Sequence, residues 1–303
     1  MTISGIHEGL AEQGYISTRQ IDISVKGAMA GTPLLIEGDP GTGKTILAET
    51  VSKMLGLPLI RVQFYEGITA DKILYDYDYQ KQLLTIEAIK SSLEEGLKGK
   101  GIQQALDMTG QIDFYGKEFL IRRPILQSIT GEKRCVLLLD EVDKSSEEIE
   151  YTLLEFLDTY SMSIPQYGTV RCPEDMRPIV FITSNDYREL SDAFRRRCLY
   201  LYIPPKTAEE MKTIIQTKAG ADEKLAEGIA RCIVDIRKLS LKQQPSAAEA
   251  VLWAKYLMDG ENGGAEETAE MTIVKDQEDM EMLRRSGLVQ RYVTFSAMNC
   301  RTW

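Results

Sequence analysis

Residues 38–45 carry the clearest chemical pattern in this chain, because they read Gly-Asp-Pro-Gly-Thr-Gly-Lys-Thr. This G-x-x-x-x-G-K-[ST] spacing lies between an apolar run at 34–36 and a stretch with helical periodicity. Glycines here let backbone N–H groups point at phosphate oxygens, and the helix that follows adds its positive end. The pattern predicts a phosphate cradle for a nucleotide, in which Lys44 reaches the β and γ phosphates and Thr45 holds Mg²⁺.

Two adjacent carboxylates, Asp140 and Glu141, follow the apolar run 137–139. Beside a phosphate cradle, Asp140 would support Mg²⁺ through its water shell, and Glu141 would polarise an attacking water. Strands often end in acidic residues, so this interpretation depends on the glycine-rich motif upstream. Asn185 follows another apolar segment and could orient the same water, with a simple turn residue as the alternative.

Three consecutive arginines, 195–197, precede the last apolar segment. Such a run is usually a solvated surface, but an arginine offered to the γ-phosphate of a neighbouring subunit is its other common use. His7 is the only histidine, so a Ser-His-Asp or Cys-His catalytic group is not expected. The five cysteines form no C-x-x-C pair, which predicts reduced, structural thiols.

Short apolar segments predict the strands that must position these residues. They lie at 33–36, 59–64, 135–139, 178–183 and 199–203. Because they alternate with helical sequence, starting with a helix expected over 15–29, they predict a parallel sheet covered on both faces. The serine and glutamate pattern at 145–148 predicts a helix start, and 160–170 predicts a hairpin or loop. Residues 66–133 are too many for a plain connection and should carry their own helices and an exposed hairpin or loop.

After Pro204-Pro205 the sequence changes in character. Helical periodicity without strand patterns is found at 207–218, 222–239, 247–258 and 273–285, whereas 259–270 has the composition of an exposed loop. We therefore expect a boundary near Lys206. It divides an α/β nucleotide-binding core at 1–206, with the insert within 66–133, from a helical lid and C-terminal tail at 207–303.

The overall composition restricts the classes of function. The chain has 303 residues and a formal net charge of -10, which argues against a surface that binds nucleic acid. The N-terminus lacks the basic flank and apolar core of a signal peptide, and no apolar run approaches the length of a membrane span. We expect a cytoplasmic protein.

These motifs in this order resemble the AAA+ ATPases, and more closely their MoxR-like branch, from about residue 15 to about residue 285. Further matches are Tyr65-Glu66-Gly67, residues 74–84, Arg122-Arg123-Pro124, Arg195-Arg196-Arg197-Cys198, and Pro245-Ser246 followed by Glu249 and Trp253-Ala254. They look most like the CoxD-like subgroup, the accessory ATPases of carbon monoxide dehydrogenase maturation. One departure is that residues 243–246, where many such lids place the sensor 2 arginine, read Gln-Gln-Pro-Ser. Lys242 is nearby, and a surface lysine is the preferred interpretation of it.

The resemblance implies an α/β fold: an AAA+ P-loop core with a five-stranded parallel sheet flanked by helices, plus a C-terminal helical lid. It implies ATP and Mg²⁺ as cofactors, a homo-oligomeric ring, taken as a hexamer, and nucleotide between the subunits. By position, Asn185 resembles sensor 1 and Arg197 the arginine finger, with Arg196 as the alternative one register step away. The residues that would contact nucleotide or metal are Asp39, Pro40, Gly41, Thr42, Gly43, Lys44 and Thr45 in the loop, Asp140 with Thr45 at the metal, and Tyr15 and Ile16 beside adenine.

Three functions follow as hypotheses. The first, implied by the resemblance, is ATP hydrolysis coupled to remodelling or maturation of a client metalloenzyme, with a partner of the von Willebrand factor A domain type. In this hypothesis the insert and the 160–170 hairpin face the pore or the substrate. The alternative is an ATP-dependent switch or scaffold that recruits a partner with little hydrolysis, motivated by the missing sensor 2 arginine. A DNA-associated motor is a weaker third hypothesis.

Overall fold

The computed structural model describes residues 1–96, 113–259 and 264–294. Its main sheet has five strands in the order β2-β5-β8-β1-β9. Their bounds are β1 (Leu34–Glu37), β2 (Leu59–Gln63), β5 (Val136–Asp140), β8 (Ile179–Ser184) and β9 (Leu199–Tyr202). The sheet is parallel; Leu59 pairs with Val136 across β2 and β5, and Val136 pairs with Ile179 across β5 and β8. The predicted parallel sheet is confirmed, and each strand lies within one residue of its expected bounds.

The interior strands consist almost entirely of buried residues. Every residue of β1, β5 and β8 is buried, whereas β2, at one edge, is only partly buried. Parallel strands covered by helices on both faces lose contact with water on both sides, which explains why the apolar runs are continuous rather than alternating. The polar residues that end these strands are therefore held on a rigid frame.

Helices and short helical turns precede the first strand of the sheet or lie between its strands. They are α1 (Ile3–Glu12), α2 (Arg19–Met29), α3 (Lys44–Leu55), α8 (Glu147–Thr159), α9 (Asp192–Arg195), and the 3₁₀ turns η1 (Val142–Lys144) and η2 (Glu174–Met176). The helix expected from residue 15 begins only at Arg19, and α1 was not predicted. Helix α8 starts within the predicted segment 145–148, but the side chain of its N-cap, Ser146, makes no capping hydrogen bond.

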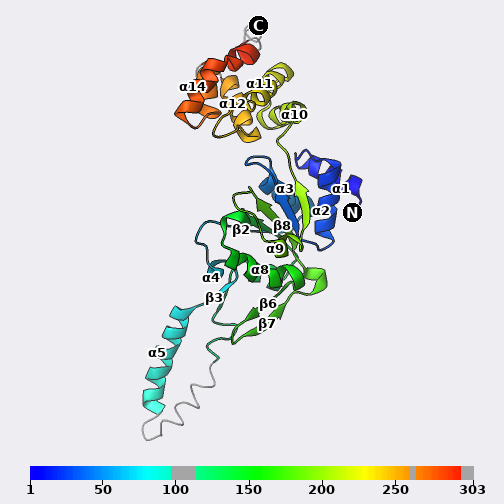
Figure 1. Cartoon of the computed structure of the whole chain (residues 1–303). Helices are drawn as coiled ribbons and strands as arrows, with labels where there is room; N and C mark the ends of the chain where they lie inside the picture. The colour runs from blue at the N-terminus through cyan, green and yellow to red at the C-terminus, as the bar shows by residue number, and fades with distance from the viewer. Residues whose placement is uncertain (97–112, 260–263, 295–303) are drawn as a thin grey trace. The chain divides into compact units, whose positions relative to one another are not determined.

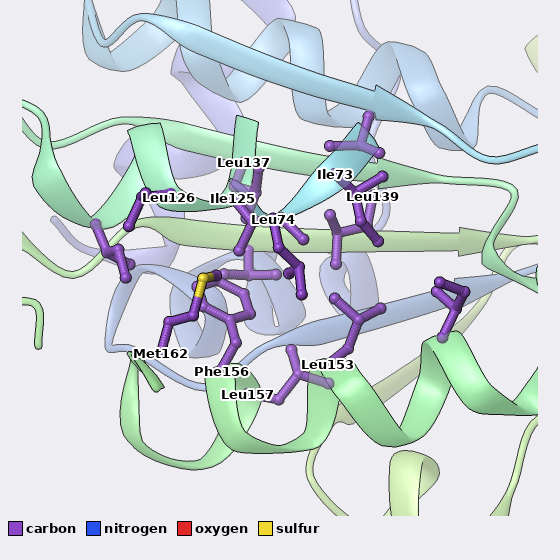
Figure 2. Packing of buried hydrophobic residues seen from close by; sticks show 14 of the residues in the cluster. Ile73, Leu74, Ile125, Leu126, Leu137, Leu139, Leu153, Phe156, Leu157 and Met162 are labelled. Atoms are coloured by element: carbon purple, nitrogen blue, oxygen red, sulfur yellow. The ribbon is translucent and has the colours of Figure 1, made fainter. Parts of the chain in front are cut away.

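One apolar cluster fills the space between the sheet and α8. Figure 2 shows Leu153, Phe156 and Leu157 of α8 pointing toward Leu137 and Leu139 of β5. These side chains are at most 3% exposed. Burial of apolar side chains at this spacing fixes α8 on the sheet and so fixes the loop between β5 and α8.

The insert within 66–133 has its own secondary structure, as predicted. It contains α4 (Ala70–Ile73), β3 (Tyr75–Tyr77), α5 (Tyr79–Gly96), β4 (Leu120–Arg122) and α7 (Pro124–Thr130). β3 and β4 pair antiparallel, and α5 extends from β3 as a long helix (Figure 1). Residues 97–112 of the insert lie outside the described residues. The expected 160–170 hairpin is present as β6 (Ser161–Ile164) paired with β7 (Gly168–Arg171).

The C-terminal part is helical. It contains α10 (Ala208–Ala219), α11 (Glu223–Ile236), α12 (Ala247–Asp259), α13 (Ala265–Thr272), α14 (Gln277–Ser286) and the π-type turn η3 (Gln290–Thr294) (Figure 1). A complete capping box starts α10, because Thr207 Oγ1 accepts from Glu210 N while the Glu210 carboxylate accepts from Thr207 N.

The exposed loop expected over 259–270 is wrong from residue 265 onward. These residues form α13, and Thr268 and Ala269 are fully buried. The hydroxyl of Thr268 also accepts a hydrogen bond from Nε1 of Trp253, at 3.2 Å. Small residues on one face of a polar helix can therefore pack against a large aromatic core, which composition alone does not reveal.

The chain divides into two compact units. The first comprises residues 1–23, 36–50 and 201–303, and the second comprises 24–35 and 51–200. The glycine-rich loop and the C-terminal helices thus share the first unit. Asp140, Glu141, Asn185 and the arginines belong to the second. The expected boundary near Lys206 stays a prediction.

Four cysteines in the described residues, Cys135, Cys172, Cys198 and Cys232, are free thiols. Burial raises the pKa of Cys135 to about 11 and the pKa of Cys232 to about 12, so these thiols stay protonated and unreactive at neutral pH. Of the helices in the described residues, none is long and apolar enough to cross a membrane.

Replacing Leu137 tests the packing beneath the carboxylates. Leu137 is 0% exposed, so Leu137→Ala should lower the free energy of unfolding by about 3 kcal/mol through lost contacts and a cavity. The matched control Leu84→Ala removes a side chain that is 65% exposed and should change it by less than about 0.5 kcal/mol. Urea denaturation followed by circular dichroism measures both, and equal effects of the two variants would contradict the assigned core.

Candidate active site

The glycine-rich loop of the first unit wraps around a buried lysine. Lys44 begins α3, is 6% exposed, and its ammonium donates to the carbonyl oxygens of Gly38 at 2.6 Å and Asp39 at 2.9 Å. The hydroxyl of Thr42 also donates to the Asp39 carbonyl, at 2.9 Å. A cation is therefore held inside the loop at the start of a helix, where the macrodipole adds further positive potential.

The loop depends on glycine at position 41. Gly41 has φ +79°, and a Cβ there would collide with the side chain of Ser246, the residue before α12. A side chain would thus be strained and would also push away the C-terminal helices. The segment where a sensor 2 arginine was sought therefore lies against the loop, but it presents Ser246, a small hydroxyl.

Tyr15 packs against the same loop. A Cβ on Gly43 would lie 3.7 Å from the Tyr15 ring, and the Lys206 ammonium lies 5.8 Å from the ring centroid. Tyr15 is 7% exposed, and its hydroxyl is buried without a hydrogen-bond partner in the described part of the chain. Burial raises the pKa of Tyr15 far above its ordinary value, and the nearby Glu210 raises it further. Burial lowers the pKa of Lys206, and there Glu210 acts in the opposite direction.

A cavity of about 250 Å³ lies beside Tyr15 in this unit. Its apolar lining includes Ala11, Ile16 and Ile214. The structure thus places both residues predicted beside adenine, Tyr15 and Ile16, on the wall of one cavity between the N-terminal segment and α10. A flat ring with an apolar face is the kind of group that such a cavity accommodates.

Arg237, which follows α11, is a partly buried cation that the sequence analysis did not single out. It donates to the carbonyl oxygens of Pro245 at 2.9 Å and Lys206 at 3.0 Å. Burial lowers the pKa of Arg237, and the carboxylates of Asp39 and Glu249 raise it. The C-terminal helices therefore supply an arginine near the glycine-rich loop from a different position than expected. Lys242, in contrast, is exposed and pairs with Asp276 and Glu278, as a surface lysine does.

Asp140, in the second unit, is a buried carboxylate at the end of β5. One of its oxygens accepts from the hydroxyl of Thr183 on β8 at 2.6 Å, and the other accepts from the guanidinium of Arg61 on β2 at 2.5 Å. Both partners come from neighbouring strands of the sheet. Buried carboxylates persist only when such donors compensate them, so Arg61 and Thr183 are part of this site.

Glu141 follows in a left-handed conformation, with φ 60° and ψ 48°. This conformation is rare for a residue with a Cβ and turns the side chain away from the strand direction. One carboxylate oxygen accepts from the amide of Asn185 at 2.8 Å. The other accepts from Gln63 at 2.7 Å and Lys144 at 2.8 Å, and the hydrogen bond to Glu141 raises the pKa of Lys144.

The loop after β8 is fixed by Asp143. Its carboxylate accepts from the backbone N–H groups of Asn185 at 3.0 Å and Tyr187 at 2.8 Å. Asn185 is thereby held so that its amide reaches Glu141. The structure thus brings together three of the predicted residues, Asp140, Glu141 and Asn185, on adjacent strands.

The arginines behave differently from one another. Arg197 forms an ion pair with Asp158 at 2.6 Å and donates to the Ala193 carbonyl at 2.8 Å. The hydrogen bond with Asp158 raises the pKa of Arg197. Arg196 is exposed. Neither residue belongs to the cluster around Glu141.

The residues present fit a nucleotide and a divalent ion. The buried lysine, the glycines that a side chain would obstruct, and the unpartnered Tyr15 hydroxyl all lie along one loop and its neighbouring cavity. Within the described ranges, no group of three or more histidine, cysteine or carboxylate side chains could hold a metal alone. Mg²⁺ is commonly held by one or two protein oxygens together with substrate phosphates, which matches the few oxygen ligands available here.

Sequence reasoning missed Arg61, Gln63, Lys144 and Arg237. The first two alternate on β2 with the buried Val62, so their side chains share a face, but a polar residue on an edge strand carries no signal by itself. Only the β2–β5 register, which sets Arg61 against Leu138 and Gln63 against Asp140, shows that they reach the carboxylates.

Replacing Asp143 tests whether it fixes the Asn185 loop. Asp143 is buried, so Asp143→Ala should lower the free energy of unfolding by about 2 kcal/mol, because two backbone N–H groups lose their carboxylate acceptor. The exposed carboxylate Asp175 is the control, and Asp175→Ala should have little effect. Amide hydrogen exchange should also become faster at Asn185 and Tyr187, and unchanged exchange there would contradict this role.

Comparison with known proteins gives the chain a family. The AAA domain, dynein-related subfamily, matches residues 33–198, more than half of the chain. A Lon protease of Fusobacterium nucleatum is 24% identical over 207 residues, which cover 67% of this chain and 22% of that protein. Midasin of Giardia intestinalis is 22% identical over 249 residues, which cover 78% of this chain and 4% of midasin. The chain thus spans under a quarter of the length of these relatives.

A solved structure of a Thermotoga maritima RuvB mutant aligns with 94% of this chain and 70% of that chain, with 15% identity and a TM-score of 0.46. The family match covers the glycine-rich loop, both carboxylates, Asn185 and the arginines. The chain belongs to the AAA domain family, in its dynein-related subfamily.

Proposed function

We propose that the chain binds and hydrolyses ATP as a MoxR-like AAA+ protein. In this proposal the loop residues Asp39 to Thr45 bind the phosphates. The support comes from Lys44, which is already held at the centre of the loop by two carbonyl oxygens. Because the Lys44 ammonium is already in place, little free energy is lost in ordering it when phosphate binds. The loop is therefore suited to a triphosphate.

Thr45 and Asp140 are the proposed residues for Mg²⁺, which when bound would neutralise charge on the phosphates. Asp140 is oriented by hydrogen bonds from Thr183 and Arg61. Arg61 forms an ion pair with the same carboxylate, which compensates its burial without a bound metal ion.

Glu141 is the proposed base that takes a proton from the attacking water, and Asn185 orients it. The observation that carries the proposal is the left-handed Glu141, whose carboxylate is held by Asn185 on the next strand. In the described part of the chain, one oxygen of Glu141 accepts only from Asn185, so it keeps a lone pair to which a water can donate, whereas the other oxygen already accepts from Gln63 and Lys144.

Arg197 is the proposed arginine finger, contributed to the nucleotide of an adjacent copy in a hexameric ring, with Arg196 as the alternative. Its ion pair with Asp158 holds the guanidinium near the protein surface, where both side chains are partly exposed. A planar guanidinium suits the spread charge of a transferring phosphoryl group.

The proposed client is a metalloenzyme under maturation, with a von Willebrand factor A domain type partner, as for the CoxD-like subgroup. This part rests on the motif resemblance at residues 65–84 and 122–124. The long α5 helix and the β6–β7 hairpin are the proposed elements that face the client.

A second candidate function is an ATP-dependent switch that recruits a partner with little hydrolysis. The observation in its favour is that the Glu141 carboxylate already accepts hydrogen bonds from three side chains. Partner recruitment by a Glu141→Gln protein with undiminished strength would support this candidate over the first.

Replacing Glu141 tests hydrolysis directly. Glu141→Gln removes the base but keeps the shape, so turnover should fall by roughly 10²-fold or more while ATP binding persists. Phosphate release measures turnover, and equilibrium dialysis with ATP measures binding. Hydrolysis by the variant at the parent rate would show that Glu141 is not the base.

Mixing two inactive variants tests the finger. Arg197→Ala retains its loop but lacks the finger, whereas Lys44→Ala loses phosphate binding but keeps the finger. If the phosphate loop and the finger of one site come from different copies, an equal mixture should recover about a quarter of the parent rate. In randomly assembled rings, about a quarter of the interfaces pair an intact loop with an intact finger. If Arg196→Ala is the variant that is inactive alone and recovers in the mixture, in place of Arg197→Ala, the role passes to Arg196. No recovery in either mixture, with ring assembly intact, would contradict a finger supplied by a neighbour.

A further inference from the structure

A polar group from three segments borders the 250 Å³ cavity of the first unit. Nδ1 of His7, on α1, lies 3.0 Å from a carboxylate oxygen of Asp22 on α2 and 2.9 Å from the hydroxyl of Ser17. The side chain of His7 is 53% exposed, whereas that of Asp22 is 3% exposed. His7 and Ser17 both line the cavity. The imidazole is thus anchored by a buried carboxylate at the edge of an open site.

This is not the arrangement of a nucleophilic triad, which needs one partner on each imidazole nitrogen. Here both Ser17 and Asp22 contact Nδ1. An ionised carboxylate can only accept hydrogen bonds, so the shared proton must lie on Nδ1 of His7. In the neutral ring Nε2 then carries a lone pair, and among the described residues no hydrogen bond engages it. Asp22 therefore makes His7 a hydrogen-bond acceptor toward a ligand.

The cavity is connected to the phosphate loop through Tyr15. The Tyr15 ring lies against Gly43 of the loop on one side, and the residue lines the cavity on the other. If the proposed function is correct and phosphates bind at 38–45, the base of the same nucleotide can reach this cavity. Its apolar walls, with Ile16 and Ile214, would cover the faces of the base and leave the polar edge to be recognised.

We propose that His7 is a specificity-determining residue that recognises position 6 of a purine, with Asp22 as its positioning residue. Nε2 accepts a hydrogen bond from the 6-amino group of adenine. Hypoxanthine and guanine carry a 6-oxo group there, so two acceptors would face each other and the site would disfavour them. Lys218, which also lines the cavity, is a donor available to N7, an acceptor that these purines share.

Binding of ADP and IDP, which differ in this substituent, tests the proposal without hydrolysis. Titration calorimetry at roughly pH 7.5 works above the ordinary pKa of an imidazole. The parent chain should bind ADP about tenfold more tightly than IDP, as expected for one hydrogen bond gained or lost. His7→Ala should bring the ratio close to one, chiefly by weakening ADP. The exposed neighbour Glu8, outside the cavity lining, is the control, and Glu8→Ala should keep the parent ratio.

Asp22→Asn supplies a sharper test, because a carboxamide can donate to Nδ1 and so move the imidazole proton to Nε2. His7 then becomes a donor, and the preference should invert toward IDP. A merely structural Asp22 would weaken both nucleotides alike. Circular dichroism verifies that each variant folds, and His7→Ala, on an exposed position, decides the matter if Asp22→Asn does not fold.

The outcomes separate this proposal from the function on which it rests. If His7→Ala binds both nucleotides with the parent ratio, His7 does not recognise the base and the proposal is overturned, while nucleotide binding stands. If the folded parent chain binds neither ADP nor IDP, the proposed ATP-binding function itself fails.

Discussion

The buried charge of Asp140 is the constraint on which the second unit is built. Asp140 is 2% exposed and ends a strand whose other residues are all buried and apolar. A carboxylate in such surroundings is tolerated only when donors compensate it, and the donors must come from the strands on either side. Arg61 on β2 and Thr183 on β8 meet this need. The order β2-β5-β8 is therefore a chemical requirement of the site as well as a feature of packing.

The same principle extends along the loop after β5. The hydroxyl of Thr183 accepts the N–H of Glu141 while it donates to Asp140, which joins the two acidic residues through one side chain. Asp143 then holds the loop that carries Asn185, and Asn185 holds Glu141. Three carboxylates at the end of one strand are thus oriented by fixed donors rather than by solvent. Because each donor in this network has a defined acceptor, the network can switch only by exchanging whole hydrogen bonds. A rearrangement that depends on nucleotide requires such a switch.

The sequence was sufficient for features that are local. The strands are continuous apolar runs, the glycine-rich loop is contiguous, and Asp140 and Glu141 follow their strand directly, so all could be placed without tertiary information. Arg61 and Gln63 could not be identified, because only strand register brings them to residues almost 80 positions away.

Features set by packing between distant segments were also missed. The buried face of α13 lies within polar sequence, and its burial depends on Trp253 from another helix. The grouping of His7 with Asp22 depends on how α1 and α2 cross, which no spacing encodes. The proposed function requires a second copy to complete the site of ATP hydrolysis. The ATPase rate per chain, measured against protein concentration alongside the assembled fraction from sedimentation, tests this most directly. The rate per chain should rise in parallel with assembly; a rate per chain that stays constant while assembly goes from absent to complete would contradict the shared site.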